Sequence, residues 1–363
     1  MKKIIIAALI LISIISCNSK KTDNTEVTVN TNTVNTNNTE ISNNDEYVED
    51  NNTEEINTDT AEISEVPEWD LEAFNDLKNV KDAESLKSFE EKHGERSLIM
   101  ALQYGDKKMV TELLSYGANV DQTYVDNDSP LKTASAKGDL ELVKDFIKRG
   151  ANVNFRGEGN IDALHSAVMS TNENSLKIMK ELLDAGAEVD VEYGWEEPFP
   201  ILLDTIGVDE SKCDLEKFKM LTEYGADINY VDSYGYPLIR YAVNAGCLDI
   251  VKYLVSKGID PAMKYELKEY YPNVNISLLA STLYNSDTEM AKYLIEQGAD
   301  VNTPIPSEDG YPLLLQAIDN GKTELVKLLI EKGADTTVVN KEKKTVFDIA
   351  REKGYNDIVA LDK

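Results

Sequence analysis

The sequence predicts an all-α solenoid, a linear array of short helical hairpins that stack on one another. A glycine-centred phrase recurs along the 363-residue chain, and successive glycines lie 33 to 40 residues apart. An amphipathic segment precedes each glycine, and a short proline-containing phrase opens several units. Periods of this size are typical of solenoids, in which each unit buries its apolar side against its neighbours. The clearest copies of the glycine phrase are Gly117–Asp121, Gly150–Asn154, Gly186–Asp190, Gly225–Asn229 and Gly298–Asn302.

Residues 1–16 are predicted to be a targeting segment. Lys2 and Lys3 precede an apolar run, Ile4 to Ile15, that is too short to cross a bilayer. With Cys17 directly behind it, the segment resembles a bacterial lipoprotein signal peptide. The resemblance implies that Cys17 is acylated and holds the mature chain to a lipid bilayer. The alternative is an ordinary secretion signal cleaved nearby, and in both cases we expect the protein to be exported.

Residues 17–66 are predicted to form a disordered tether. The stretch is rich in Asn, Thr and acidic residues and has almost nothing apolar to bury. Without apolar burial, the entropy lost on ordering is not offset. A flexible chain of this length has an end-to-end distance of roughly 40 Å. We therefore expect the tether to hold the folded part away from the lipid surface.

Residues 67–95 are predicted to cap the first unit with two short helices. Apolar residues recur there at helical spacing, namely Trp69, Leu71, Phe74, Leu77, Leu86 and Phe89.

The repeats occupy residues 96–344. In Leu140–Arg149 apolar residues recur at steps of three and four, which predicts a helix with one buried face. The glycine that follows ends the helix, because the residue after a helix often takes a left-handed backbone. In Ser129-Pro130-Leu131, proline suits the first helical position and serine caps the helix. One small slot recurs in eight units: Ala101, Ala134, Ala167, Thr205, Ala242, Ser281, Ala317 and Ala350.

These phrases resemble the ankyrin repeat, with its T-P-L-H opening and its G-A-D-V-N exit. The resemblance covers roughly residues 96–363 and implies about eight helix-turn-helix units with short β-hairpin fingers. Residues 345–363 are then the C-terminal capping repeat. We expect a longer finger after Asp260 and a lengthened loop at Cys213.

Charge and composition exclude several classes of function. The formal net charge is −29, and so acidic a chain repels phosphate backbones. We therefore expect no nucleic acid partner and a basic or neutral protein partner. The three cysteines show no zinc spacing. Asp121, Asp126 and Asp128 lack the glycine and glutamate of a calcium loop, so no metal or other cofactor is expected.

Catalysis has little support in the sequence. His93 and His165 are the only histidines, and no nucleophile, zinc-protease or P-loop motif occurs. The ankyrin resemblance implies a structural role for His165, as a hydrogen-bond partner of a neighbouring unit. We therefore expect no enzyme and no small-molecule substrate. A hydrolase-like site in the insertion from Asp260 to Asn275 is a weak alternative.

Cys213 and Cys247 are both expected near the inter-helix turns of adjacent units. Equivalent positions in stacked repeats usually lie too far apart for a disulfide. The lengthened loop at Cys213 could bridge the difference, and an exported protein permits the bond. The pair is therefore either a disulfide or two free thiols.

Aromatic residues gather in the arms between hairpins, where they mix with acids such as Glu192 and Asp232. Aromatic side chains are frequent energetic centres of protein interfaces. The alternative is that several of them pack between fingers. The predicted partner-binding residues are Tyr193, Trp195, Tyr230, Tyr234, Tyr236, Tyr265, Tyr270 and Tyr271.

Together these features favour a non-catalytic protein–protein interaction scaffold. The acyl chains on Cys17 would anchor it in the bacterial cell envelope, and a partner would bind the concave face made by fingers and first helices. A structural tether between lipid and another layer of the envelope is the alternative.

Overall fold

Pairs of antiparallel helices follow one another in the computed structural model, which describes residues 66–123, 128–193, 199–207, 213–267, 271–285, 287–305 and 311–362. Eight pairs occur in these residues. They are α4 Ser97–Tyr104 with α5 Lys107–Tyr116, α6 Pro130–Lys137 with α7 Leu140–Lys148, α8 Ala163–Met169 with α9 Ser175–Asp184, α10 Leu202–Ile206 with α11 Leu215–Glu223, α12 Leu238–Ala245 with α13 Leu248–Ser256, α14 Leu278–Asn285 with α15 Thr288–Glu296, α16 Leu313–Asp319 with α17 Thr323–Glu331, and α18 Val346–Lys353 with α19 Asn356–Val359.

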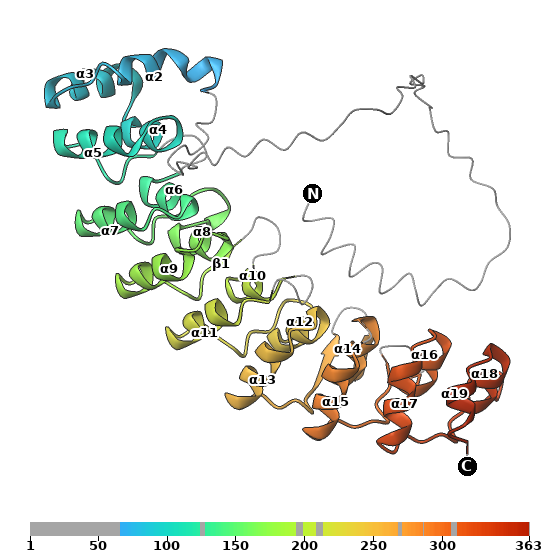
Figure 1. Cartoon of the computed structure of the whole chain (residues 1–363). Coiled ribbons are helices and arrows are strands. Elements are labelled where there is room, and N and C mark those ends of the chain that lie inside the picture. The colour runs from blue at the N-terminus through green and yellow to red at the C-terminus, as the bar shows by residue number, and fades with distance from the viewer. Residues whose placement is uncertain are drawn as a thin grey trace, which may run out of the picture. The chain divides into compact units, whose positions relative to one another are not determined.

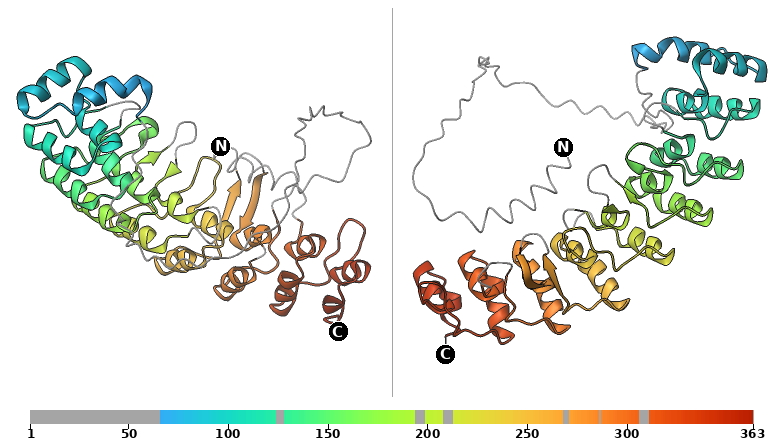
Figure 2. Two further views of the ribbon diagram at one scale, coloured as in Figure 1. Left: turned by 45° about the horizontal axis from the view of Figure 1, so that its top comes forward. Right: turned by 180° about the vertical axis from the view of Figure 1, so that it is seen from behind.

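The pairs stack side by side in sequence order (Figure 1). From α4 to α18, the first helix of each pair packs on the first helix of the next pair. The second helices form a parallel row, and the first helices line the inner side of the curve that the stack describes (Figure 2). This arrangement is the all-α solenoid that the sequence predicts.

The small slot explains how the first helices approach one another. All eight of its residues are at most 2% exposed, from Ala101 in α4 to Ala350 in α18. A small side chain at the contact lets two helix backbones come close, and the larger apolar residues on either side fill the remaining space.

Glycines are required at two kinds of turn. Gly117 ends α5 with a φ of 94°, a left-handed conformation that residues with a Cβ rarely adopt. Gly138 ends α6 with a φ of 76°, and an added Cβ would lie 2.2 Å from Cγ of Asn172 in the next unit. At Gly138 the close packing of two units excludes any side chain.

Hydrogen bonds between glycine phrases tie successive units together. At four junctions an Asn or Asp side chain accepts a bond from a backbone N–H of the next phrase. The pairs are Asp121 with Asn152 (2.8 Å), Asn154 with Glu188 (2.9 Å), Asp190 with Asp227 (2.8 Å) and Asn302 with Asp335 (2.8 Å). We call this series the phrase ladder.

Lysines also join neighbouring units. Lys217, which is 8% exposed, donates from Nζ to the carbonyl oxygens of Val168 (2.8 Å) and Ser170 (2.7 Å) at the end of α8. Lys353 donates to the carbonyl of Asp319 (2.6 Å) at the end of α16. Positive charge at a helix C-terminus satisfies carbonyls that lack an intrahelical partner.

Two helices, α2 Leu71–Leu77 and α3 Ala83–His93, lie where the sequence predicts the cap. Asp70, fully buried, accepts a hydrogen bond from Nη1 of Arg96 at 3.0 Å, next to the start of α4. Within the cap, hydrogen bonds from Lys92 and from His93 of α3 join the two helices at Asp76 of α2 and lower the pKa of that carboxyl. The cap is thus joined to the first unit by polar contacts as well as by its apolar residues.

Residues 1–65, which include the predicted signal segment, Cys17 and nearly all of the predicted tether, lie outside the described residues. Among the helices that are described, none is long and apolar enough to cross a membrane.

Candidate partner-binding surface

The arms between hairpins carry the predicted binding residues. Two arms contain antiparallel strand pairs: β1 Glu192–Tyr193 with β2 Phe199–Pro200, and β3 Lys264–Leu267 with β4 Tyr271–Ser277. The second pair is the longer finger that the sequence predicts after Asp260. The insertion from Asp260 to Asn275, for which a hydrolase-like site is the alternative, contains most of this strand pair.

Tyr193 is buried rather than exposed. Its side chain is 1% exposed, its ring stacks on His165 with centroids 4.2 Å apart, and its hydroxyl donates to Asp162 at 2.9 Å. Asp162 also caps α8 by accepting from the backbone N–H of His165. Nε2 of His165 lies 2.8 Å from Asp204 in α10. Tyr193 thus joins two units, which corrects the expectation that it faces a partner.

Burial governs the electrostatics of this cluster. It raises the pKa of Asp162, although the bonds from His165 and Tyr193 act in the opposite direction. It also raises the pKa of the Tyr193 hydroxyl, and the charge of Asp162 adds to that effect. The hydroxyl therefore stays protonated and serves as a donor.

Tyr236 and Tyr265 are buried as well, at 6% and 7% exposure. Arg240 stacks on the Tyr236 ring, with its Cζ 3.7 Å from the ring centroid, and its Nε donates to the Tyr265 hydroxyl at 3.0 Å. The Tyr265 hydroxyl also lies 3.2 Å from Oγ of Ser281 in α14. Both tyrosines pack between fingers, so the expectation that they face a partner is corrected for them too.

Asp232 organises the same arm. Its Oδ1 accepts from the backbone N–H groups of Tyr234 (2.9 Å) and Tyr236 (2.8 Å), and its Oδ2 accepts from the Tyr241 hydroxyl. Burial and the bond to Asp232 raise the pKa of Tyr241. The carboxylate fixes the turn between the Val231 and Pro237 backbones, which form an isolated bridge.

What remains accessible on these arms is a smaller set, which we call the acidic arm patch: Glu192, Tyr230, Val231, Asp232 and Tyr234. Glu192 is exposed, Val231 is 50% exposed, and the other three are half-buried. Burial and the negative charges of Asp232 and Glu192 raise the pKa of Tyr230 to about 12. Among the described residues, the Tyr230 hydroxyl has no hydrogen-bond partner. The patch offers an apolar side chain beside carboxylates and a free donor.

Three predicted residues are not placed on this surface. Trp195 and Tyr270 lie outside the described residues. Tyr271 begins β4, but its side chain is not described. Arg240 and Val231 were not expected from the sequence. The spacing of Arg240, four residues after Tyr236, is the signal that could have identified it, because an arginine commonly stacks on a nearby aromatic ring.

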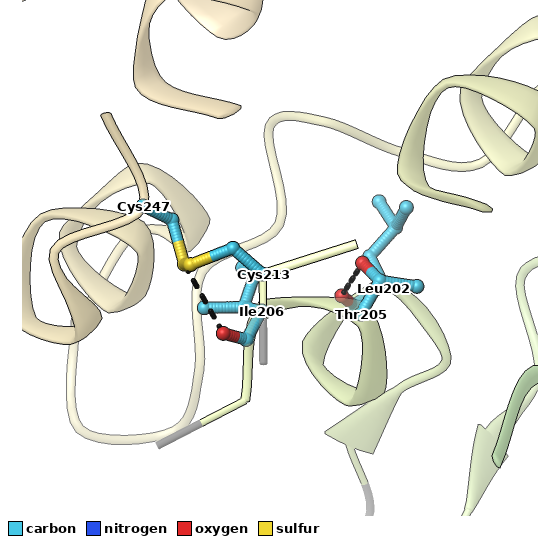
Figure 3. Close-up of a disulfide and its surroundings, with 5 residues drawn as sticks. All are labelled: Leu202, Thr205, Ile206, Cys213 and Cys247. Atoms are coloured by element: carbon cyan, nitrogen blue, oxygen red, sulfur yellow. Dashed lines mark hydrogen bonds between the residues drawn. A yellow bond between two sulfur atoms is a disulfide. The ribbon is translucent and has the colours of Figure 1, made fainter. Parts of the chain in front are cut away.

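Cys213 and Cys247 form a disulfide with their Cα atoms 5.6 Å apart (Figure 3). Cys213 precedes α11 and Cys247 precedes α13, so the bond joins the inter-helix turns of the fourth and fifth pairs. Of the two alternatives left open by the sequence, the structure contains the disulfide.

The described residues contain no group of three His, Cys, Asp or Glu side chains arranged to hold a metal ion. A pocket of about 250 Å³ lies between the segment that follows α15, the start of α16 and the segment that follows α17, where Val301, Leu314 and Val338 form part of its lining. Its polar residues Asn302 and Asp335 already bond to each other in the phrase ladder.

Comparison with known proteins agrees with this architecture. A family model described as ankyrin repeats (3 copies) matches residues 81–193 and 277–361, and one described as ankyrin repeats (many copies) matches residues 210–255. The ankyrin repeat domain of human ASB11 superposes with a TM-score of 0.51 at 22% identity, covering 65% of this chain and 99% of that domain.

Two viral relatives are similar in sequence. An ankyrin repeat protein of Acanthamoeba polyphaga mimivirus is 30% identical over 175 residues, 48% of this chain and 22% of the relative. An ankyrin repeat protein of fowlpox virus is 38% identical over 79 residues, 22% of this chain and 18% of the relative. The chain thus spans about a fifth of the length of these relatives. The stacked hairpins, the recurring phrases and the family models together show that this chain belongs to the ankyrin repeat family.

Proposed function

We propose that the chain is a protein–protein interaction scaffold of the bacterial cell envelope, without catalytic activity. Acyl chains on Cys17 would hold it to the bilayer, and the arms and first helices would bind a basic protein. Ankyrin repeats suggest a protein partner, but the repeat fixes a shape and not a ligand. The partner's character must be argued from the surface.

The acidic arm patch is the observation that carries the proposal. Val231 is half exposed, and the Tyr230 hydroxyl, which has no hydrogen-bond partner among the described residues, lies close to the charges of Glu192 and Asp232. The arm from 185 to 201 carries five glutamates or aspartates and no lysine or arginine. Such a surface attracts lysine or arginine side chains over long range and can cover an adjacent apolar residue.

Two peptides of equal length test the partner's chemistry. One alternates lysine and leucine and the other alternates glutamate and leucine. Titrated into the full chain, the basic peptide is expected to bind, more weakly as salt rises, while the acidic peptide does not. Glu192→Gln is expected to weaken binding about threefold to tenfold, since a single charge pair contributes about 0.5–1.5 kcal/mol.

The matched control is Glu216→Gln, which removes an exposed glutamate from α11 on the second-helix row. This variant changes the net charge by the same amount as Glu192→Gln. Because Glu216 is not part of the acidic arm patch, the affinity should stay nearly unchanged. Equal losses in both variants would show that net charge, rather than the patch, attracts the peptide. Binding of the acidic peptide would reject the proposed partner class.

Anchoring is tested separately. Replacing Cys17 by alanine in the producing bacterium is expected to move the protein from the membrane fraction to the soluble fraction and to abolish incorporation of labelled palmitate. Retention of label after that change would place the acyl chain elsewhere.

A further inference from the structure

The junction between the fourth and fifth pairs lacks a contact that the three preceding junctions have. The phrase ladder joins the three preceding junctions. The next rung would join the side chain of Asn229 to the backbone N–H of Asp260, and within the described residues no such bond is formed. On the side of the C-terminal ends of α11 and α13, this junction is held instead by the contact between the Thr222 and Tyr253 hydroxyls (2.7 Å) and by edge-on packing of Phe218 on Tyr253.

The disulfide crosses the same junction at the opposite ends of those helices. Cys213 directly precedes Asp214, the N-cap of α11, and Cys247 is the N-cap residue of α13. Their Cα separation of 5.6 Å suits a disulfide without movement of the backbone. Cys247 is 2% exposed, whereas Cys213 is half-buried and more accessible.

The neighbouring helix α10 ends against the disulfide. It has only five residues and no side-chain cap at its N-terminus. Sγ of Cys247 lies 3.1 Å from the carbonyl oxygen of Ile206, the last residue of α10 (Figure 3). On its other side, Asp204 of α10 meets His165, and Lys217 of α11 bonds to the end of α8. At the inter-helix turns, the fourth pair is thus fastened to the third by polar contacts and to the fifth by the disulfide.

We propose that Cys213 and Cys247 form a redox-controlled clamp on the junction between the fourth and fifth pairs. When the pair is oxidised, the clamp holds α10, α11 and α13 in register. When it is reduced, α10 and the N-terminal ends of α11 and α13 loosen, while the pairs on either side stay folded.

The chemistry requires a dithiol reductant, which supplies two electrons. Its thiolate attacks Sγ of Cys213, the more accessible sulfur, and Cys247 leaves as a thiolate. The second thiol of the reductant then displaces Cys213 and closes the reductant's own disulfide. Two protons end on the two cysteines, and the Cys247 thiol gains the Ile206 carbonyl as a hydrogen-bond acceptor.

The clamp would also regulate the proposed binding surface, a consequence that rests on the proposed function. Strand β2 leads directly into α10, and β2 pairs with β1, which carries Glu192 of the acidic arm patch. Loosening of α10 would release this arm from the position that it holds in the oxidised protein.

Hydrogen exchange of the full chain, with and without dithiothreitol, tests the clamp. On reduction, the amides of α10 and of the first turns of α11 and α13 are expected to exchange about tenfold faster, while α6 to α8 and α16 to α18 do not change. The double variant Cys213→Ser, Cys247→Ser should show the fast exchange in both conditions. The clamp would be overturned if protein prepared without reductant contained free thiols at Cys213 and Cys247. It would also be overturned if reduction left the exchange rates unchanged or raised them uniformly along the array.

The same samples separate the clamp from the proposed function. The lysine–leucine peptide is expected to bind the oxidised protein several-fold more tightly than the reduced protein. If exchange responds locally and affinity does not, regulation of the surface is rejected. If the peptide binds neither form, the proposed function fails, and the exchange data alone decide whether the clamp exists.

Discussion

Tyr193 is an aromatic residue of an acidic arm, yet its side chain is buried because both its ring and its hydroxyl have partners. Its ring covers His165, and its hydroxyl has a carboxylate partner, so the one polar group of the buried side chain is satisfied. The arrangement depends on Asp162, whose pKa is raised by burial. The folded-state pKa therefore lies above the value near 4 of an unfolded chain. Above that pKa the ionised carboxylate lowers the free energy of unfolding, and the hydrogen bond from the Tyr193 hydroxyl makes this loss smaller.

Tyr193→Phe should consequently destabilise the protein in a pH-dependent way. The substitution removes a bond that favours the carboxylate, so the pKa of Asp162 rises further. At pH 7 we expect the free energy of unfolding to fall by about 1–3 kcal/mol, the cost of a buried acceptor without its donor. Near pH 4, where Asp162 becomes protonated in the folded state, the loss should be smaller. Urea unfolding at both pH values measures the difference.

Tyr224→Phe is the control for this effect. Its hydroxyl also donates to an aspartate, Asp184, but the side chain is 39% exposed and water can replace the bond. Its loss should stay within about 0.5 kcal/mol at both pH values. A loss at Tyr193 that does not depend on pH would mean that Asp162 is not its electrostatic partner.

The candidate site was only partly predictable from single residues. Composition drew attention to the arms, but the burial of Tyr193, Tyr236 and Tyr265 could not be deduced. Their exposure depends on contacts with residues 25 to 31 positions away, such as Asp162 and Arg240. Local pattern carries no information about such partners. Val231 was overlooked because an isolated valine in a turn has no pattern of its own.

At the scale of elements, the phrase ladder explains the recurrence of Asn or Asp at the end of the glycine phrase. Where the ladder forms, the residue at that position is Asp121, Asn154, Asp190 or Asn302. The copy that begins at Gly258 has Ala262 there, and alanine has no acceptor to offer. Its junction with Asp300 therefore lacks the rung for a chemical reason.

Ala262→Asn should supply the missing acceptor. In the register of the other rungs, its side chain would meet the backbone N–H of Asp300. We expect the free energy of unfolding to rise by about 0.5–1.5 kcal/mol, the usual net contribution of one hydrogen bond. Denaturant unfolding provides the measurement, and hydrogen exchange at Asp300 locates the new bond.

Asn302→Ala is the reciprocal variant, since it removes an existing rung to Asp335. It should lower stability by a similar amount. If Ala262→Asn does not protect the Asp300 amide, the finger of β3 and β4 holds the phrase in a different register, and the account of the missing rung is wrong.

The elements themselves were largely predictable. Glycine, proline and apolar spacing act within a few residues of one another, so helix pairs, their turns and the longer finger follow from local sequence. The disulfide was left open because it depends on the distance between two units, which the repeat fixes only approximately.

At the scale of the molecule, stability should be distributed along the array as a series of nearest-neighbour terms. Rungs of the phrase ladder join the first four pairs, and the next two junctions lack them. The disulfide adds a covalent link at the first of these gaps. With the disulfide intact we expect the array to unfold in one step, and with it reduced we expect the part before α12 and the part from α12 onward to separate.

The two tryptophans make this separation measurable, because Trp69 and Trp195 both precede α12 in the sequence. Tryptophan fluorescence therefore reports the first part, whereas far-ultraviolet circular dichroism reports helices throughout. In urea the two transitions should coincide for the oxidised protein and diverge after reduction, because a single cooperative step requires coincident probes. The double variant Cys213→Ser, Cys247→Ser should diverge with or without reductant. Coincident transitions in that variant would show that packing of α10, α12 and α14 suffices to couple the two parts and that the missing rungs do not divide the array.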